Sequence, residues 1–187
     1  MRSPHPNRAF TLIELLIVIG IIGALSSIIL VSLDVAREKA KVMKAVAQIR
    51  EVNNAAGLFK ADTGTIPDSC GLDCDATKDP YLNALGVTGW NGPYLSGGVW
   101  NMPHAWLGHF SVIKEDLDSD GTDELYVLLD EDAPGTNEGD NTGPIPLTAL
   151  KSIDRILDDG DLSTGEARGN GDGFSTAEGE IAYRLEL

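Results

Sequence analysis

The sequence predicts an α+β fold in which a long N-terminal α-helix packs on a small antiparallel β-sheet. An almost unbroken apolar run, residues 10–33, is followed without proline by an amphipathic stretch, residues 34–60. Short apolar or alternating runs then recur between Gly- and Asp-rich turns in residues 61–187. Helical periodicity followed by strand periodicity is typical of a two-layer domain with a helix on one face of a sheet.

Length and charge limit the classes of protein to consider. The 187 residues have room for one modest globular domain plus an anchoring segment. The 14 Lys and Arg residues against 29 Asp and Glu residues give a formal net charge of −15. This charge argues against nucleic-acid binding, which needs a basic surface. An acidic surface keeps an exported domain soluble or binds divalent cations, and composition leaves both open.

The apolar run at residues 10–33 is long enough to span a membrane, because a bilayer core needs ~20 apolar residues in a helix. The leader before it, residues 1–9, carries two arginines and no acidic residue, which favours the cytoplasmic side. Three interpretations compete: a secretory signal cleaved near residues 24–26, an ordinary anchor, or a short leader removed from an apolar segment that is kept. Glu14 is the single charge in the run and needs a partner there, which favours the third.

Residues 9–14, AFTLIE, resemble the prepilin peptidase motif of type IV pilin-like proteins. The resemblance implies cleavage between Ala9 and Phe10, methylation of the new Phe10 amine, and pairing of Glu14 with that amine on a neighbouring subunit. The family normally has Gly where this chain has Ala9, and many members have a helix-kinking Pro where Val31 stands.

The same resemblance implies a location and a set of partners. We expect a single-pass protein of the cytoplasmic membrane whose C-terminal head lies outside the cytoplasm and which becomes a structural subunit of a pilus or pseudopilus. The expected partners are other copies of the chain, other pilin-like subunits, prepilin peptidase, the inner-membrane assembly platform and membrane lipid, with no nucleic acid. The alternative is an anchored or secreted calcium-dependent adhesion module that does not polymerise.

The stretch at residues 34–60 continues the helix and carries one apolar stripe. The predicted stripe consists of Val35, Val42, Val46, Ile49 and Val52. Residues 10–60 would then form one helix, roughly 75 Å long at 1.5 Å per residue. Residues 61–67, ADTGTIP, stop the helix with glycine and proline and resemble the segment that ends the long helix in pilin-like proteins.

Residues 90–95, WNGPYL, resemble a stretch of the major pseudopilins of type II secretion. Trp90 and Tyr94 bracket a Gly-Pro turn and are expected to clamp this loop onto the head, with a sugar-binding aromatic pair as the alternative. Three later runs predict the strands of the sheet: residues 109–113, 125–129 and 181–187.

An acidic loop at residues 116–125, DLDSDGTDEL, predicts a calcium site. Ca²⁺ prefers six to eight oxygen ligands, and alternating acids around a glycine turn supply several from one loop. The predicted ligands are Asp116, Asp118, Asp120, Thr122 and Glu124. Position twelve of the loop is Val127 inside an apolar run, which excludes an EF-hand. A solvated acidic turn is the alternative.

The two cysteines, Cys70 and Cys74, exclude a four-cysteine metal site and allow a local disulfide or two free thiols. A second acidic tract, residues 158–173, lacks regular alternation and is interpreted as a long surface loop rather than a metal site.

We predict no enzymatic activity. The sequence contains no nucleophile elbow, zinc-protease, P-loop or dinucleotide motif. His104 and His109 lie outside any recognisable catalytic or metal motif, and we expect each to be structural or on the surface.

Overall fold

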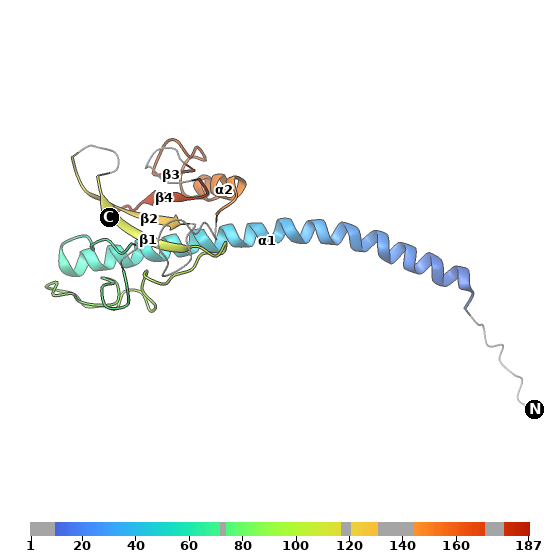
Figure 1. Cartoon of the computed structure of the whole chain (residues 1–187), viewed down its shortest axis with the longest axis horizontal. Coiled ribbons are helices and arrows are strands. Elements are labelled where there is room, and N and C mark those ends of the chain that lie inside the picture. Colours follow the sequence, from blue (N-terminus) through green and yellow to red (C-terminus); the bar gives the residue numbers. More distant parts are fainter. Residues whose placement is uncertain (1–9, 72–73, 117–120, 131–143, 171–177) are drawn as a thin grey trace, which may run out of the picture. The chain divides into compact units, whose positions relative to one another are not determined.

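The computed structural model describes residues 10–71, 74–116, 121–130, 144–170 and 178–187, and only the backbone of residues 27–32. The chain divides into two compact units, Met1–Glu38 and Lys39–Leu187, called here the N-terminal unit and the head. Helix α1 (Leu12–Thr63) belongs partly to each (Figure 1). The predicted long helix is therefore confirmed, and it ends three residues later than expected.

The end of α1 follows from its local sequence. Gly64 has a φ of 77°, a left-handed conformation that glycine adopts without steric cost, and its N–H donates to the Lys60 carbonyl at 2.9 Å. This is the αL cap that ends many helices. The Thr63 hydroxyl donates to the Phe59 carbonyl at 2.8 Å and satisfies a second carbonyl of the last turn.

Four strands form one antiparallel sheet in the described part of the head, in the order β1-β2-β4-β3. The strands are β1 (His109–Glu115), β2 (Glu124–Asp130), β3 (Ala167–Gly169) and β4 (Ile181–Arg184). The central register places Val127 opposite Val112 on one side and Tyr183 on the other. The three runs predicted as strands are confirmed, although β4 ends at Arg184 rather than at Leu187.

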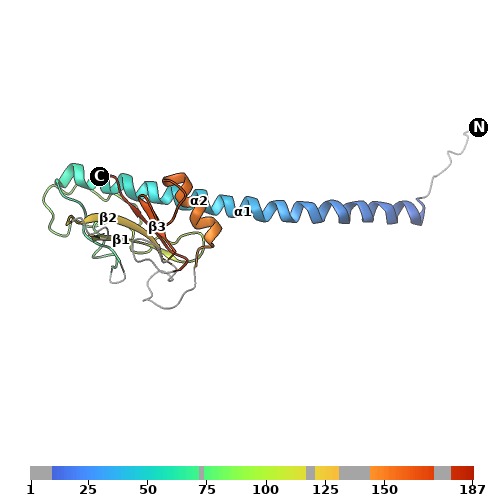
Figure 2. The same ribbon diagram turned by 90° about the horizontal axis from the view of Figure 1, so that it is seen from above.

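Within the head, α1 runs alongside the sheet (Figures 1 and 2), and the two share one apolar core. Alternate residues of β2 contribute to this core, and α1 contributes residues three or four apart, as the helical period requires. The buried side chains of α1 are Val42, Ala45, Val46, Ile49, Val52, Ala55, Ala56 and Phe59. The predicted stripe was wrong at Val35, which is 55% exposed and lies in the N-terminal unit.

Helix α2 (Leu147–Leu157) and β3 were not predicted from the sequence. Helix α2 buries Ala149, Leu150 and Ile153, an amphipathic pattern short enough to be overlooked beside the acidic tract that follows it. The interpretation of residues 158–173 as a long loop was wrong at Ala167–Gly169, which pair with β4. Gly169 is required there, because a Cβ would lie 2.3 Å from the Glu180 carbonyl oxygen.

Candidate functional site: an exposed apolar helix with a capped start

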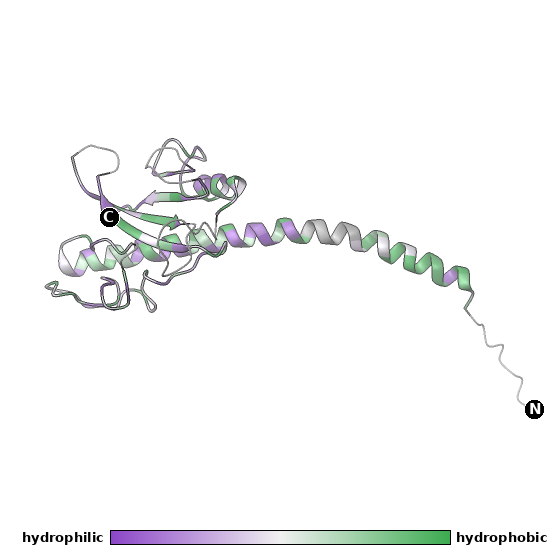
Figure 3. Cartoon of the chain, viewed as in Figure 1, coloured by the Kyte–Doolittle hydropathy of each residue, from purple (hydrophilic) through white to green (hydrophobic). Residues whose placement is uncertain are grey.

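The N-terminal apolar segment, residues 10–26, is exposed at every position. Consecutive residues such as Leu16, Ile17 and Val18 are each at least 50% exposed, so no side of the helix is shielded. Figure 3 shows the same apolar character around the first part of α1. A helix that is apolar on all sides normally lies in a protein core or in lipid. This segment therefore needs a covering that the described residues of the N-terminal unit do not supply.

Glu14 and Thr11 form a capping box at the start of α1. The Thr11 N–H donates to Glu14 Oε2 at 2.8 Å, and the Glu14 N–H donates to Thr11 Oγ1 at 3.3 Å. The Thr11 hydroxyl also donates to Oε2 at 2.9 Å. These reciprocal bonds satisfy two N–H groups that the helix leaves without partners. The sequence signal, a Thr followed three positions later by a Glu, was present but not used in the sequence analysis.

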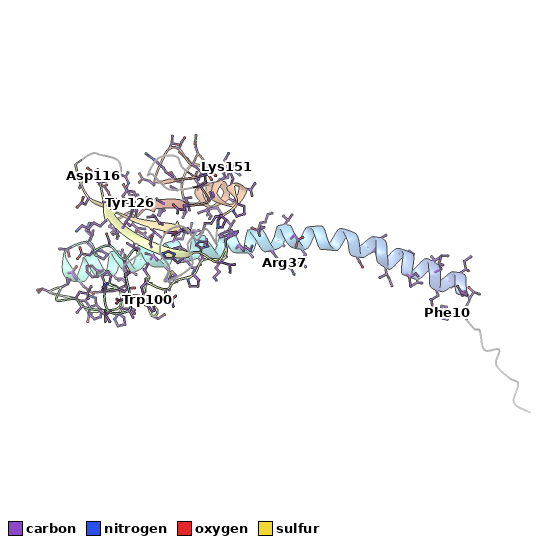
Figure 4. The ribbon with its side chains drawn as sticks, in the orientation of Figure 1. Phe10, Arg37, Trp100, Asp116, Tyr126 and Lys151 are labelled. Carbon is purple, nitrogen blue, oxygen red and sulfur yellow. A yellow bond between two sulfur atoms is a disulfide. The ribbon has the colours of Figure 1, made fainter. Side chains whose placement is uncertain are left out.

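The predicted processing and assembly residues lie beside this cap. Ala9 falls outside the described residues, so the cleavage site and its Ala are untested. Phe10 is 84% exposed at the start of the described chain, where Figure 4 labels it. Among the described residues, every hydrogen bond that Glu14 accepts goes to Oε2, which leaves Oε1 for a charged group from another molecule. Pairing of Glu14 with a neighbouring amine stays a prediction.

The WNGPYL loop contacts the end of α1, as predicted. The Trp90 and Tyr94 rings meet edge to face, with centroids 5.6 Å apart, and Tyr94 meets Phe59 of α1 at the same distance. The Tyr94 hydroxyl donates to Asp62 Oδ2 at 2.9 Å, and the Trp90 indole donates to the Pro80 carbonyl at 3.1 Å. Both aromatic rings thus serve contacts within the head, which supports the structural interpretation over sugar binding.

The neighbouring loop contains a buried carboxylate that the sequence analysis did not single out. Asp79 is fully buried and accepts backbone N–H groups from Tyr81, Val99 and Trp100 at 2.5 to 3.0 Å. Gly98 lies against it with a φ of 67°, and a Cβ there would approach Asp79 Oδ2 to 2.2 Å. Three donors satisfy the charge, so this residue organises the loop.

His104 is buried, which agrees with its predicted structural role. Its Nδ1 accepts the Trp106 N–H at 3.2 Å, so Nε2 carries the proton and donates to the Asp130 carbonyl at 2.7 Å. Burial lowers the pKa of His104 to about 4, against a smaller raising effect of the Asp130 carbonyl. The imidazole is neutral at pH 7. His109 is also buried, at the start of β1.

The predicted calcium loop is only partly described. Asp118 and Asp120 lie outside the described residues, so the ligand set is untested. Asp116 Oδ2 accepts the Gly121 N–H at 2.9 Å, and Gly121 has a φ of 93°, as a tight turn requires. Glu124 begins β2, and its carboxylate accepts the Tyr126 hydroxyl at 3.4 Å. Calcium binding by Asp116, Thr122 and Glu124 stays a prediction.

Cys70 and Cys74 form a disulfide in the structure. Cys70 also pairs with the edge of β1, because it exchanges both backbone hydrogen bonds with Val112, at 2.7 and 3.0 Å. These backbone bonds hold the segment after α1 beside the sheet, and the disulfide closes a short loop within that segment.

A long N-terminal helix that is apolar and exposed at its start, and that packs on an antiparallel sheet further along, defines the pilin-like class of proteins. The comparisons agree. Residues 4–30 match the prokaryotic N-terminal methylation motif, and residues 34–139 match type II secretion system protein G. The chain belongs to the type II secretion system protein G family, the major pseudopilins.

Named relatives cover most of the chain. Type II secretion system core protein G of Vibrio cholerae is 34% identical over 149 residues, which is 76% of this chain and 92% of the relative. The Aeromonas hydrophila protein of the same name is 32% identical over 131 residues, 62% of this chain and 87% of the relative. The Escherichia coli protein of the same name is 32% identical over 108 residues, which is 51% of this chain and 74% of the relative. No solved structure matches the chain.

In the described part of the chain, no helix has both the length and the hydropathy of a membrane span.

Proposed function

We propose that this chain is a structural subunit of the type II secretion pseudopilus, processed by prepilin peptidase and assembled through its N-terminal helix. The observation that supports this proposal most directly is the exposed apolar segment at residues 10–26, with Glu14 as its one charge. In a filament, neighbouring copies of the same segment would cover it and remove its apolar surface from water. Membership of the protein G family supports the same role.

The proposal includes a membrane stage. Residues 10–33 would lie in the cytoplasmic membrane, with the head outside the cytoplasm, until the subunit enters the filament. Prepilin peptidase would remove residues 1–9, and the Phe10 amine would be methylated, as the match to the methylation motif supports. The inner-membrane assembly platform and other pilin-like subunits would be the remaining partners.

The two oxygens of Glu14 suggest two simultaneous tasks. Oε2 caps α1 through Thr11, and Oε1 faces no donor within the described chain. A neighbouring Phe10 amine could pair with Oε1 without breaking the cap. The pair would form among apolar side chains, where a lone carboxylate is costly and a paired one is tolerated. Such pairing would fix the axial position of each subunit.

Three variants separate the charge of Glu14 from its capping role. Glu14→Gln keeps both halves of the capping box but removes the charge, Thr11→Val removes the hydroxyl that accepts the residue-14 N–H but keeps the charge, and Glu14→Val removes the charge together with the acceptor for the Thr11 N–H. We expect both Glu14 variants to lose filament assembly, measured as sheared pseudopili from cells that overproduce the subunit. Thr11→Val should assemble, with α1 weakened by about 1 kcal/mol. Normal assembly of Glu14→Gln together with failure of Thr11→Val would contradict the proposed pairing.

Mass spectrometry of the N-terminus from native membranes tests processing. The expected product begins at a methylated Phe10. A chain that retains residues 1–9, or one that begins near Ser27 as a secretory signal would leave it, would contradict the proposal.

A further inference from the structure

Two exposed leucines of the head have a backbone conformation that leucine rarely adopts. Leu85 has a φ of 46° and is 50% exposed, and Leu107 has a φ of 80° and is 72% exposed. Outside glycine, positive φ values are found mainly at Asn and Asp, and Asn170, the third such residue in the described ranges, fits this preference. An apolar side chain at both leucine positions therefore needs a reason beyond the turns themselves.

The loop that presents Leu107 is held in place from both sides. The His104 N–H donates to the Gly108 carbonyl at 2.9 Å, and the Leu107 N–H donates to the His104 carbonyl at 3.2 Å. Where the loop meets α1, Gln48 Nε2 donates to the Pro103 carbonyl at 3.2 Å. These bonds fix the loop and leave the Leu107 side chain on the surface, available to another molecule.

A small pocket beyond the other end of β1 contains the second leucine. Its volume is about 240 Å³, below the ~300 to 1,000 Å³ of pockets that bind small molecules. A pocket of this size suits a single side chain from another molecule. Its walls come from the end of α1 and the segments that follow it, and they are mainly apolar: Phe59, Ile66, Pro80, Leu85 and Val87.

We propose that Leu107 of one copy of the chain inserts into this pocket of the next copy in the filament. The inference rests on the proposed function, because it names a contact between heads that such a filament would contain. Leu107 and the pocket lie at different places on one head, so the contact is heterologous: each copy gives its leucine to one neighbour and receives a leucine from another. A contact of this kind extends into a filament when its rotation does not close a ring.

The loop and the pocket are separated by a similar distance along α1 and along β1. On α1, Gln48 holds the Leu107 loop and Phe59 lines the pocket, about 16 Å further at 1.5 Å per residue. On β1, His109 follows the loop and Lys114 lines the pocket, about 17 Å further at ~3.4 Å per residue. Helix α1 and β1 run side by side over this length (Figures 1 and 2). A neighbouring head displaced along α1 by roughly this distance brings its loop level with the pocket.

The charges beside the loop and the pocket are complementary. Lys41 Nζ lies 5.8 Å from the centre of the Trp106 ring, so positive charge lies beside the loop. At the pocket, the Asp68 side chain is 83% exposed, whereas Lys114, 3.8 Å from it, is 31% exposed. The carboxylate is therefore the outer member of this pair. Approach of the loop to the pocket brings opposite charges together, whereas two facing Leu107 loops would bring the Lys41 side chains of both copies together.

Cross-linking between two differently tagged copies tests the contact. One copy carries Leu107→Cys and the other Leu85→Cys, both are produced in the same cells, and sheared pseudopili are treated with a short bismaleimide. Cys70 and Cys74 form a disulfide, so the introduced thiols are the ones that react. We expect a dimer that contains both tags and that requires both variants. Leu147→Cys, at a leucine of α2 that is 47% exposed, replaces Leu107→Cys as the matched control and should give no dimer.

The outcomes of cross-linking distinguish this inference from the proposed function. Pseudopili that contain both variants without the mixed dimer would overturn the inference and leave the proposed function intact. An equal yield of dimer with Leu147→Cys, or a dimer from Leu107→Cys alone, would also overturn it. Absence of pseudopili from the parent chain would instead refute the proposed function, and this inference with it.

A second variant separates assembly from folding. Leu107→Gly removes the side chain and suits the positive φ, so the Tm of the full chain in detergent should equal or exceed that of the parent. The yield of sheared pseudopili should fall at least about tenfold, as expected when one leucine side chain is no longer buried. Leu147→Ala should leave the yield unchanged. Normal assembly of Leu107→Gly, or a lowered Tm in that variant, would contradict the proposed contact.

Discussion

In the N-terminal unit every side chain from residue 10 to residue 26 is exposed, whereas in the head α1 buries a continuous face from Val42 to Phe59. The head therefore gains its stability from contacts within the chain, mainly by removing apolar surface from water. The described side chains at residues 10–26 of the N-terminal unit have no such internal contacts, so this segment relies on its cap and on the molecules that cover it. One part of α1 is thus stabilised by packing within the head, whereas its first part exposes apolar side chains that water does not favour.

A matched pair of isoleucine variants would test this difference in burial most directly. Ile49 is fully buried against the sheet, and Ile17 is 55% exposed on the same helix. We expect Ile49→Ala to lower the free energy of unfolding by about 2 to 4 kcal/mol, because it leaves a cavity. Ile17→Ala should change it by less than about 0.5 kcal/mol. Urea unfolding of the full chain in detergent measures both, and equal effects would contradict the assigned burial.

Acid should weaken the head through His104. Its folded pKa is about 4 and its unfolded pKa about 6.5, so the unfolded chain binds the extra proton as pH falls between these values. We expect the free energy of unfolding to fall by up to about 3 kcal/mol over this pH range, because each unit of difference between the two pKa values corresponds to about 1.36 kcal/mol. Protonated Nδ1 would face the Trp106 N–H, two donors in contact.

Asp154 opposes this trend, so the measurement needs a suitable background. Because its folded pKa is raised to about 6, protonation of Asp154 stabilises the head as pH falls below that value. An Asp154→Asn background removes this opposing effect. In this background, urea unfolding should give a lower free energy of unfolding at pH 4.5 than at pH 7 when His104 is present. The difference should be small when His104→Gln is added. An equal loss in both would rule out His104 as the cause.

Loss of the disulfide should have a smaller effect, confined to the head. The bond between Cys70 and Cys74 closes a short loop, for which the chain-entropy model gives about 2 kcal/mol. Cys74→Ala and reduction of the parent chain should lower stability by the same amount. Reductant should leave Cys74→Ala unchanged, and thiol labelling under native conditions checks that the parent chain begins fully oxidised.

The smallest expected effect concerns the contact between the WNGPYL loop and the end of α1. Tyr94→Phe removes the hydroxyl that donates to Asp62 and accepts the Asn91 N–H. We expect the free energy of unfolding to fall by about 1 kcal/mol, since both hydrogen bonds are near solvent. A double-mutant cycle with Asp62→Ala measures the coupling, and strictly additive losses would show that this hydrogen bond contributes nothing.

Local sequence signals predicted much of this protein because their physical causes are local. The 3.6-residue period predicted α1, alternation predicted β1, β2 and β4, and the Gly-Pro turn between Trp90 and Tyr94 predicted a clamp. Helix α2 and β3 escaped prediction because each is short and adjoins an acidic, glycine-rich tract whose composition is typical of loops. Val35 fits the apolar period but lies before the part of α1 that the sheet covers.

The sequence by itself determined the class of the chain, through an apolar run with one acid at the third helical position and a processing motif before it. Only the tertiary structure decided which polar groups are buried and what they meet. Asp79 receives three backbone donors, two of them from the distant residues Val99 and Trp100, whereas Asp154 receives no hydrogen bond from the described residues. Both are simply aspartates in sequence, because burial and hydrogen bonding depend on residues that folding brings together from remote positions.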